Sequence, residues 1–127
     1  MLVVQTYLAP SKIKGAGNGL FAASPIPRGA TVFKRHPLSY MVLSREDVCQ
    51  LPELVRSFFR TYATLRDNGW NLAWDNGRFI NHSETPNLAY DHNGDVIAVR
   101  YITKDEELTE NYVSLQEIEP FPEGGPF

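Results

Sequence analysis

The pattern of apolar and polar positions divides the chain into extended segments and one helical segment. Residues 2–8, 20–23 and 31–33 are rich in β-forming residues, and turns that contain glycine and proline separate them. Between residues 44 and 68 the apolar positions recur at steps of three and four, which is typical of an amphipathic helix. The positions of this apolar stripe are Val48, Leu51, Leu54, Val55, Phe58, Phe59, Tyr62 and Leu65. We expect the stripe to pack on its own domain rather than on a partner.

Local signals mark the limits of this helical insert. Ser44 followed by Asp47 resembles a capping box, and Pro52 is expected to divide the insert into a helical turn and a longer helix. The pair Asn68-Gly69 is expected to end the insert.

Extended structure returns after the insert. Residues 89–91 and 96–101 flank Asn93-Gly94, which predicts a hairpin with its turn at that pair. Residues 117–127 contain three prolines and two glycines and are expected to form an irregular tail. The whole pattern predicts an α+β fold that is mostly β, with a single domain over residues 1–116.

Composition narrows the class of protein. A length of 127 residues suits one domain, and 43% hydrophobic with 21% charged residues is typical of a folded chain. The net charge of −3 argues against direct nucleic-acid binding, which usually requires a basic face. Cys49 is the only cysteine, so we expect no internal disulfide and predict a reducing compartment, the cytoplasm. The sequence shows neither a signal peptide nor a membrane span, so membrane binding is not expected.

A glycine-rich segment lies between the first two expected strands. Gly15, Gly17 and Gly19 permit positive φ angles and a close approach of the backbone to a ligand, which suits a cofactor-binding turn. A hairpin turn without a ligand is the commoner use of such glycines. No Gly-Lys-Ser/Thr sequence follows, so the segment is not a phosphate-binding loop.

A polar segment, Arg-Phe-Ile-Asn-His-Ser-Glu-Thr-Pro-Asn at residues 78–87, interrupts an otherwise apolar region. Buried polar groups need specific partners, and Asn81 next to His82 supplies donors and acceptors suited to an amino-acid-like or purine ligand. A polar turn without a ligand is the alternative. His82 shows no metal-ligand spacing with His36 or His92, so we expect no metal site.

A third segment, Asp-Glu-Glu-Leu-Thr-Glu-Asn-Tyr, occupies residues 105–112. On its own it predicts a solvated acidic turn before a half-buried aromatic residue. Together, however, the three segments resemble the SET-domain lysine methyltransferases. The matching patterns are Gly-x-Gly-Leu-Phe, Arg-Phe-Ile-Asn-His-Ser-x-x-Pro-Asn and Glu-Leu-Thr-x-x-Tyr, in that order. The resemblance covers roughly residues 10–112.

This resemblance implies a fold and a cofactor. SET domains are β-clip-like stacks of small sheets, in which the Asn-His segment is threaded through a loop closed by the last motif. Their cofactor is S-adenosylmethionine, and S-adenosylhomocysteine is the product. By the family pattern, the glycine turn would contact the cofactor through its backbone, Asn81 would bind the methionine portion and His82 the adenine. The implied cofactor-binding residues are Gly17, Asn18, Gly19, Arg78, Asn81, His82 and Tyr112.

The resemblance also implies a reaction, the transfer of a methyl group to a lysine side-chain amine of a protein or peptide. Tyr112 would lie at the inner end of the lysine channel and align the amine rather than act as a general base. Tyr90 would occupy the position that tunes the number of methyl groups, which favours mono- or dimethylation. The apolar channel and the sulfonium charge would lower the pKa of the amine without a strong protein base. The alternative is a non-catalytic SET-like module that binds a lysine-containing peptide or serves in assembly.

The chain departs from many histone-directed relatives in several places. Glu84 stands where they have a zinc-binding cysteine, and no cysteine follows Tyr112, so no zinc is expected. The tail residues Phe121 and Phe127 are candidates to cover the channel, and loose packing is their alternative role. A channel residue is expected after the glycine turn, and its candidates are Phe33, His36 and Tyr40. Some very small SET proteins pair to complete the channel, so a homodimer stays open.

Overall fold

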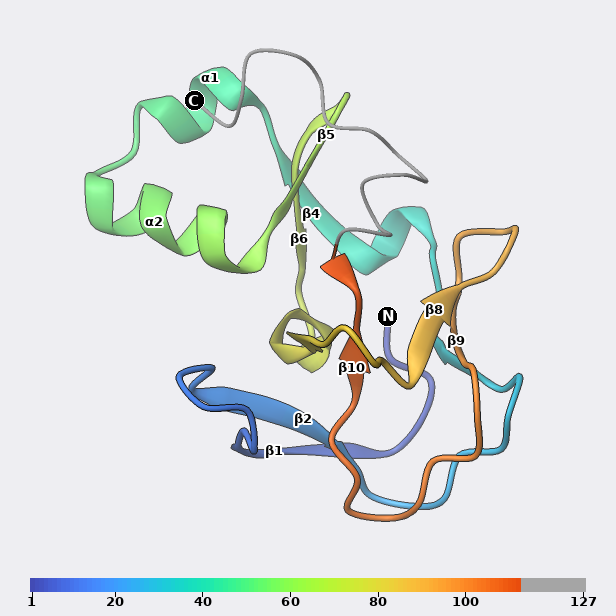
Figure 1. The fold of residues 1–127 in the computed structure, drawn as a ribbon. Helices are drawn as coiled ribbons and strands as arrows, with labels where there is room; N and C mark the ends of the chain where they lie inside the picture. Colours follow the sequence, from blue (N-terminus) through green and yellow to red (C-terminus); the bar gives the residue numbers. More distant parts are fainter. Residues whose placement is uncertain (113–127) are drawn as a thin grey trace.

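The computed structural model describes residues 1–112, and the strands of this range form four small sheets (Figure 1). The first is an antiparallel hairpin of β1 (Thr6–Pro10) and β2 (Asn18–Ala22). The second has the strand order β3 (Thr31–Phe33), β9 (Val96–Ala98) and β8 (Leu88–Tyr90). The third has the order β4 (Tyr40–Leu43), β6 (Gly69–Ala73) and β5 (Thr64–Arg66). The fourth is a parallel pair of β7 (Asn81–His82) and β10 (Thr109–Glu110). The expected mostly β stack of small sheets is therefore confirmed.

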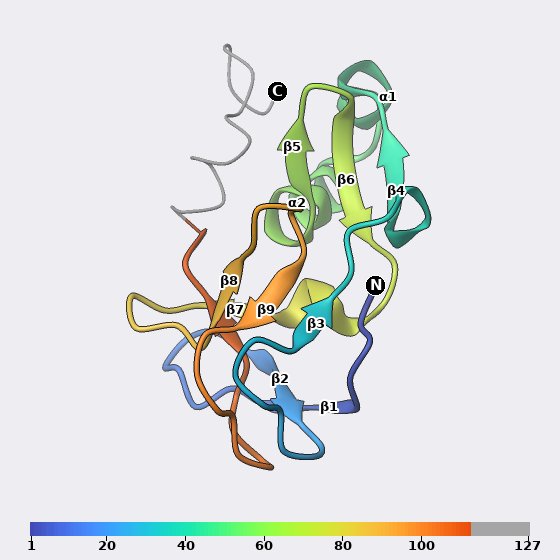
Figure 2. The ribbon, with the colours of Figure 1, turned by 90° about the vertical axis from the view of Figure 1, so that its right-hand side faces the viewer.

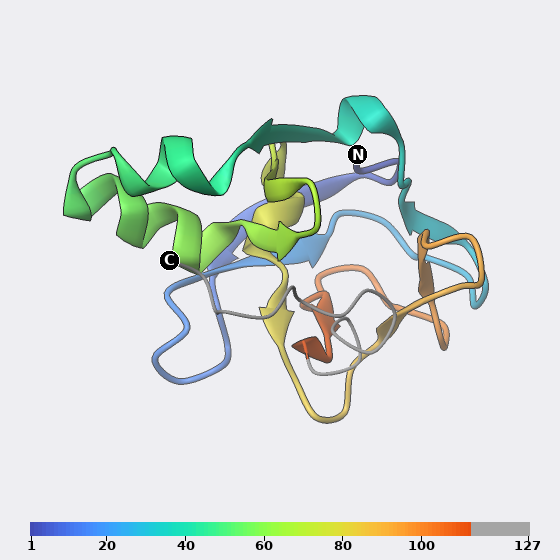
Figure 3. The same cartoon turned by 90° about the horizontal axis from the view of Figure 1, so that it is seen from above.

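The β7–β10 pair lies at the centre of the molecule. The β1–β2 hairpin lies below it and the β4–β6–β5 sheet above it in Figure 1. The helices lie behind that upper sheet in Figure 2, and Figure 3 shows them at the opposite end of the molecule from the β8–β9 hairpin. Residues on β7 and β10 are therefore placed where several sheets meet.

The helical insert forms two helices, as the sequence predicts. α1 (Arg45–Cys49) begins after Ser44, whose hydroxyl accepts a hydrogen bond from the Asp47 amide at 3.1 Å, and α2 (Glu53–Tyr62) begins after Pro52. Two short 3₁₀ helices, η1 (Pro37–Ser39) and η2 (Asn76–Phe79), complete the helical structure of residues 1–112. Within this range, no helix has the length and apolar character needed to cross a membrane.

The predicted end of the insert was wrong. α2 ends at Tyr62, and the following residues form β5 rather than another helical turn. The pair Asn68-Gly69 forms the turn between β5 and β6, and Gly69 adopts a φ of +115°. Leu65 kept the apolar spacing of the helix because β5 packs its side chain into the same core, so periodicity alone could not separate the two structures.

The predicted strand at residues 2–8 was also too simple. The first residues pair with β3, because the Val3 amide donates to the Val32 carbonyl at 2.9 Å and the Lys34 amide donates to the Met1 carbonyl at 2.7 Å. Only from Thr6 does the chain join β2. One extended segment therefore pairs with strands of two different sheets.

The predicted hairpin of β8 and β9 is confirmed, and Gly94 adopts a φ of +81° in its turn. The Asp91 carboxylate accepts hydrogen bonds from the Asn93 amide at 2.8 Å and the Asp95 amide at 3.0 Å, which fixes the turn.

Buried apolar side chains form two clusters. The larger joins the first and second sheets and the residues just before β7 and β10, through side chains such as Leu20, Val32, Leu88, Ile80 and Leu108. The smaller lies under the helices and consists of Val48, Phe59, Leu65, Trp70 and Leu72. The apolar stripe therefore packs on its own domain only in part, because Leu54 is 85% exposed and Val55 and Phe58 are also exposed.

Candidate functional site

The parallel pairing of β7 with β10 brings the second and third sequence motifs together. Asn81 lies opposite Thr109, and His82 lies opposite Glu110. The Tyr112 amide donates to Nδ1 of His82 at 3.1 Å, and the two rings lie 5.3 Å apart between centroids. The Tyr112 hydroxyl donates to the Ile80 carbonyl at 2.5 Å. Residues thirty positions apart are therefore held as one unit.

Glu107 ties the glycine turn to this unit. Its carboxylate accepts hydrogen bonds from the Ser11 hydroxyl at 2.8 Å, the Lys12 amide at 2.9 Å and the Asn81 side-chain amide at 3.2 Å. The Asn81 amide also donates to the Asn18 carbonyl at 2.9 Å. Glu107 is 8% exposed, so this acidic residue belongs to the interior rather than to a solvated turn. All three motifs converge on it.

The glycines of the turn serve two different purposes. At Gly19 an added Cβ would lie 2.6 Å from Oε2 of Glu107, so the absence of a side chain makes room for the buried carboxylate. At Gly17 the φ is +73° and an added Cβ would meet no atom within 4 Å. This glycine is required by backbone conformation, and the space beside it is open to a ligand.

Asn87, the last residue of the second motif, fastens that motif to the third. It is 1% exposed, and its side-chain amide donates to the Glu107 carbonyl at 2.8 Å and to Oε2 of Glu106 at 2.9 Å. Its side-chain oxygen accepts from the Thr109 amide at 2.9 Å. These bonds align β10 beside β7, which explains why an asparagine stands at this position.

A cavity of about 1030 Å³ opens between the β4–β6–β5 sheet and the β7–β10 pair. Three of the predicted site residues line it, namely Arg78, Tyr90 and Tyr112. All three candidates for the channel residue after the glycine turn also line it, namely Phe33, His36 and Tyr40. The remaining predicted site residues do not line this cavity, and they are Gly17, Asn18, Gly19, Asn81 and His82.

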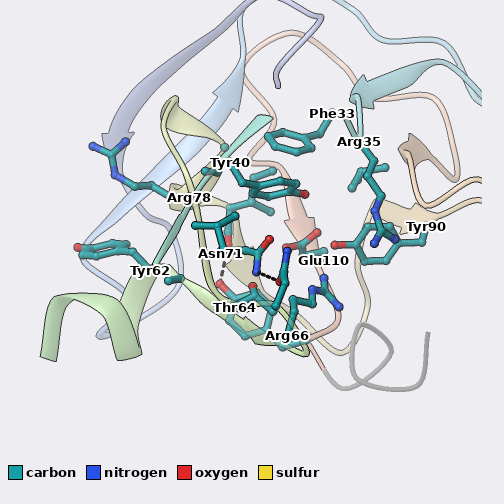
Figure 4. Close-up of a pocket in the computed structure, with 18 of the residues that line it drawn as sticks. Phe33, Arg35, Tyr40, Tyr62, Thr64, Arg66, Asn71, Arg78, Tyr90 and Glu110 are labelled. Carbon is teal, nitrogen blue, oxygen red and sulfur yellow. Dashed lines mark hydrogen bonds between the residues drawn. The ribbon is translucent and has the colours of Figure 1, made fainter. Parts of the chain in front are cut away.

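The inner part of the cavity combines three phenols with a carboxylate. In Figure 4 the carboxylate of Glu110 lies between Tyr40, Tyr90 and Arg66. Burial raises the pKa of Glu110 to about 7, although the positive charge of Arg66 acts in the opposite direction. Burial, and then the charge of Glu110, raises the pKa of Tyr112 to about 12. Burial also raises the pKa of Tyr40 and of Tyr90, so these phenols stay protonated at neutral pH.

Arg78 is anchored at the edge of the cavity. Its guanidinium donates to the Asp75 carbonyl at 2.9 Å and lies 4.7 Å from the centre of the Phe79 ring. Among residues 1–112, its buried Nε has no hydrogen-bond partner. This Nε is enclosed by protein atoms and does not face the open cavity, so Arg78 is held at the cavity edge through its terminal guanidinium nitrogen.

Two charged residues of the cavity, Arg66 and Glu110, were missed by the sequence analysis. Arg66 was assigned to the helical insert, where a charged residue suggests a solvated face. Glu110 was counted with the acidic residues of the third motif. The signal available in the sequence was the position of Glu110 in the third motif, two residues before Tyr112.

Comparisons with known proteins place this geometry in a wider context. A family model described as SET domain matches residues 17–113. Similar solved structures include an active polycomb repressive complex 2 in the basal state (25% identity, TM-score 0.63) and the Chaetomium thermophilum polycomb repressive complex 2 bound to GSK126 (25%, 0.65). The structure of ctPRC2 in an autoinhibited conformation bound to S-adenosylmethionine is 24% identical, with a TM-score of 0.63. Each similarity covers 86% of this chain but 15% or 16% of the matched chain. No curated protein matches the chain.

Proposed function

Because the chain belongs to the SET-domain family, we propose that it transfers the methyl group of S-adenosylmethionine to a lysine side-chain amine of a protein or peptide. One observation carries this proposal. The β7–β10 pairing and the hydrogen bond from Tyr112 to His82 bring Asn81, His82 and Tyr112 together, and Tyr112 lines the cavity. The S-adenosylmethionine bound to the similar ctPRC2 structure supports the choice of cofactor.

The residues present fit such a cofactor. The cavity of about 1030 Å³ suits an organic ligand together with an entering side chain, since ligand sites commonly measure about 300–1,000 Å³. The open space beside Gly17 suits a close contact between the backbone and a ligand. We assign the cofactor to the Gly17–Asn18–Gly19 turn, Arg78, Asn81, His82 and Tyr112. When bound, S-adenosylmethionine supplies an electrophilic methyl group on a positively charged sulfur.

Tyr112 is best suited to align the acceptor amine. Its hydroxyl is fixed on the Ile80 carbonyl, and a pKa of about 12 keeps the phenol protonated. A fixed, neutral phenol offers an oxygen dipole to the amine but cannot accept its proton at neutral pH. Alignment of two reacting groups can supply up to about 7–11 kcal/mol of the barrier. We therefore assign alignment, and not proton removal, to Tyr112.

The acceptor side of the cavity holds the predicted Tyr90 and the candidate Tyr40. Two protonated phenols beside the amine offer hydrogen-bonding oxygens and occupy space that a third methyl group would need. We therefore keep mono- or dimethylation as the expected product. Covering of the channel by Phe121 and Phe127 remains a prediction, because the tail at 117–127 lies outside the described residues.

Several other expectations remain predictions. The similar solved structures are multi-subunit complexes, which supports a protein substrate or partner but leaves a homodimer untested. The absence of a metal, of direct nucleic-acid binding and of membrane binding was predicted from the sequence, as was the cytoplasmic location. The domain limit at residue 116 also remains a prediction.

A non-catalytic module that binds a lysine-containing peptide is the alternative function. Peptide binding alone would require neither the hydrogen bonds of Asn81 to the glycine turn nor a fixed phenol at Tyr112. Calorimetry with S-adenosylmethionine separates the two proposals. We expect saturable binding that Asn81→Ala abolishes, while Asn93→Ala, at the exposed tip of the β8–β9 hairpin, leaves it intact. Absence of saturable binding to the unmodified protein would favour the module.

Methylation of a peptide array then tests the chemistry. We expect Tyr112→Phe to lower the rate about a hundredfold or more, since misalignment of a reacting group has effects of this size. Tyr101→Phe is the matched control, because Tyr101 is 55% exposed and lies outside the cavity lining. Full activity of Tyr112→Phe would remove the role assigned to this phenol.

A further inference from the structure

Glu110 places a carboxylate inside the cavity, beside the phenols assigned to the acceptor amine. It lines the same cavity as Tyr40, Tyr90 and Tyr112, and its charge acts on all three phenols. Figure 4 shows the carboxylate pointing into the space between Tyr40 and Tyr90. We infer that Glu110 accepts the proton that the protonated lysine amine must lose before methyl transfer, an inference that rests on the proposed function.

The backbone around Glu110 fixes the direction of its side chain. Glu110 pairs with His82 in the parallel ladder, and its carbonyl accepts a hydrogen bond from the Ser83 amide at 3.0 Å. Glu110 and Tyr112 stand two positions apart where the chain leaves β10, and both side chains reach the same cavity. The carboxylate is therefore built into the wall that carries the aligning phenol.

The phenols cannot take this role. Burial raises the pKa of Tyr40 and Tyr90, and that of Tyr112 lies at about 12, so none of them is an anion at neutral pH. Glu110 has a pKa of about 7, which is close to the value at which a general base works best near neutral pH. The sequence analysis expected no strong protein base, and this inference assigns that role to Glu110.

The charges around Glu110 favour removal of a proton from the amine. The groups that face its carboxylate are Tyr40 on β4, Arg66 on β5, Tyr90 on β8 and Tyr112 after β10. Further out, the cavity lining includes three arginines, one histidine and one aspartate, namely Arg35, Arg60, Arg78, His36 and Asp67. Arg66 is the cation that acts on Glu110, and its positive charge disfavours a charged ammonium at the same place and favours a neutral amine. Arg60 is already paired with Glu53.

The step balances in protons and electrons. The ammonium of the substrate lysine gives a proton to the Glu110 carboxylate, which leaves a neutral amine and a neutral carboxylic acid. Burial favours this exchange because it replaces two buried charges by two neutral groups. The amine lone pair then forms the nitrogen–carbon bond as the carbon–sulfur bond breaks, and the sulfur keeps that electron pair. Glu110 releases its proton to solvent through the open mouth of the cavity.

Glu110 could instead serve only to balance the charge of Arg66. The two roles differ in a measurable way. If the carboxylate is only structural, its replacement would change stability and the position of Arg66 but leave the pH dependence of the rate unchanged. If it is the proton acceptor, its replacement would lower kcat and change that pH dependence, while KM and cofactor affinity would stay nearly constant.

Glu110→Gln, Glu110→Asp and the control Glu84→Gln separate these roles. Gln keeps the size of the side chain without a basic group, and Glu84 is an exposed carboxylate outside the cavity lining. We expect Glu110→Gln to lose at least about a hundredfold in kcat near neutral pH and to recover part of it at higher pH, where the free amine is more abundant. Glu110→Asp should restore part of the rate, and Glu84→Gln should match the unmodified protein.

Two measurements that need no turnover complete the test. Calorimetry with S-adenosylmethionine should give the same affinity for Glu110→Gln and the unmodified protein, within about twofold. Carbon NMR of a protein with labelled glutamate carboxyls should show a titration near pH 7 that is absent in Glu110→Gln and moves when a lysine peptide is added. An unmoved titration, or a Gln variant that loses cofactor binding, would overturn the inference.

The outcomes also separate the inference from the proposed function. If the unmodified protein methylates lysine and Glu110→Gln keeps its rate and pH profile, the proton-acceptor role falls and the methyltransferase proposal stands. If the unmodified protein neither binds S-adenosylmethionine nor methylates lysine, both are overturned.

Discussion

The two sides of the site are held in different ways. On the side that we assign to the cofactor, Glu107 and Asn87 connect the three sequence motifs through hydrogen bonds to backbone and side chains, and both residues are buried. On the acceptor side, phenols and charges from β4, β5, β8 and β10 face a shared cavity, each brought there by a different strand. The first side is a rigid frame, and the second is an assembly of side chains whose protonation depends on burial. If the proposed function holds, we expect the hydrogen-bonded frame to fix the position of the cofactor and the charges of the cavity to act on the acceptor amine.

The largest expected effect comes from breaking the frame. Glu107→Ala leaves the Ser11 hydroxyl, the Lys12 amide and the Asn81 side-chain amide without their acceptor. We expect the free energy of unfolding to fall by about 3 kcal/mol or more, because each buried unsatisfied group costs about 1–3 kcal/mol. Urea denaturation measures this change. Glu84→Ala, at an exposed position, should change it by less than about 0.5 kcal/mol, and equal effects of the two variants would contradict the frame.

The second expected effect is a gain in the free energy of unfolding, and it comes from replacing Glu110 on the acceptor side. Burial raises the pKa of Glu110 from 4.5 to about 7, so the folded protein binds more protons than the unfolded chain between these values. Its stability therefore falls as pH rises through this window and stays low above it. Glu110→Gln removes the charge and should stabilise the protein by about 3 kcal/mol above pH 7, since one pKa unit corresponds to about 1.36 kcal/mol.

Thermal unfolding of the Gln variant at several pH values measures this prediction. The gain should shrink as pH falls towards the ordinary range of a carboxyl group, because both proteins are then neutral at this position. A gain that is independent of pH would show that Glu110 is not a buried ionised group. A stabilised but slower variant would be the expected sign of a functional residue that opposes stability.

A smaller effect is expected at Gly19, again on the frame. An added Cβ would lie 2.6 Å from Oε2 of Glu107 and 3.3 Å from Cα of Ser11. The Glu107 side chain can shift, so we expect Gly19→Ala to cost about 1–2 kcal/mol of unfolding free energy and to weaken cofactor binding in calorimetry. Gly17→Ala differs from it, because the φ of Gly17 is +73° and the new methyl group would enter the open space that we assign to the cofactor. A Gly19→Ala variant as stable as the unmodified protein would argue against the close fit of Gly19 to Glu107.

The same division explains what the sequence could predict. Local signals located the start of α1 at Ser44, the break at Pro52 and the hairpin turn at Asn93-Gly94, because each depends on a few adjacent residues. The resemblance named the three motifs that the structure brings together, and the assignment of their residues to a cofactor remains a prediction. The end of α2 and the split of residues 2–8 between two sheets were not predictable, because both depend on pairing with distant strands.

The acceptor side was the least predictable part. Arg66 carries no local signal for a cavity, since its place there follows from the antiparallel pairing of β5 with β6. Glu110 stood inside a recognised motif, yet an acidic residue in an acidic run is usually solvated. Its pKa is a property of burial, which no local pattern of residues reports.

The smallest expected effect tests how the acceptor side sets that pKa. The positive charge of Arg66 lowers the pKa of Glu110 against the dominant effect of burial. Arg66→Met keeps an apolar stem and removes the charge, so the pKa of Glu110 should rise above about 7, with little change in the frame. Carbon NMR of the labelled carboxyl would detect the shift, and the pH at which kcat rises should move upward with it. An unchanged titration would mean that Arg66 does not act on Glu110, and the acceptor side would then be controlled by burial alone.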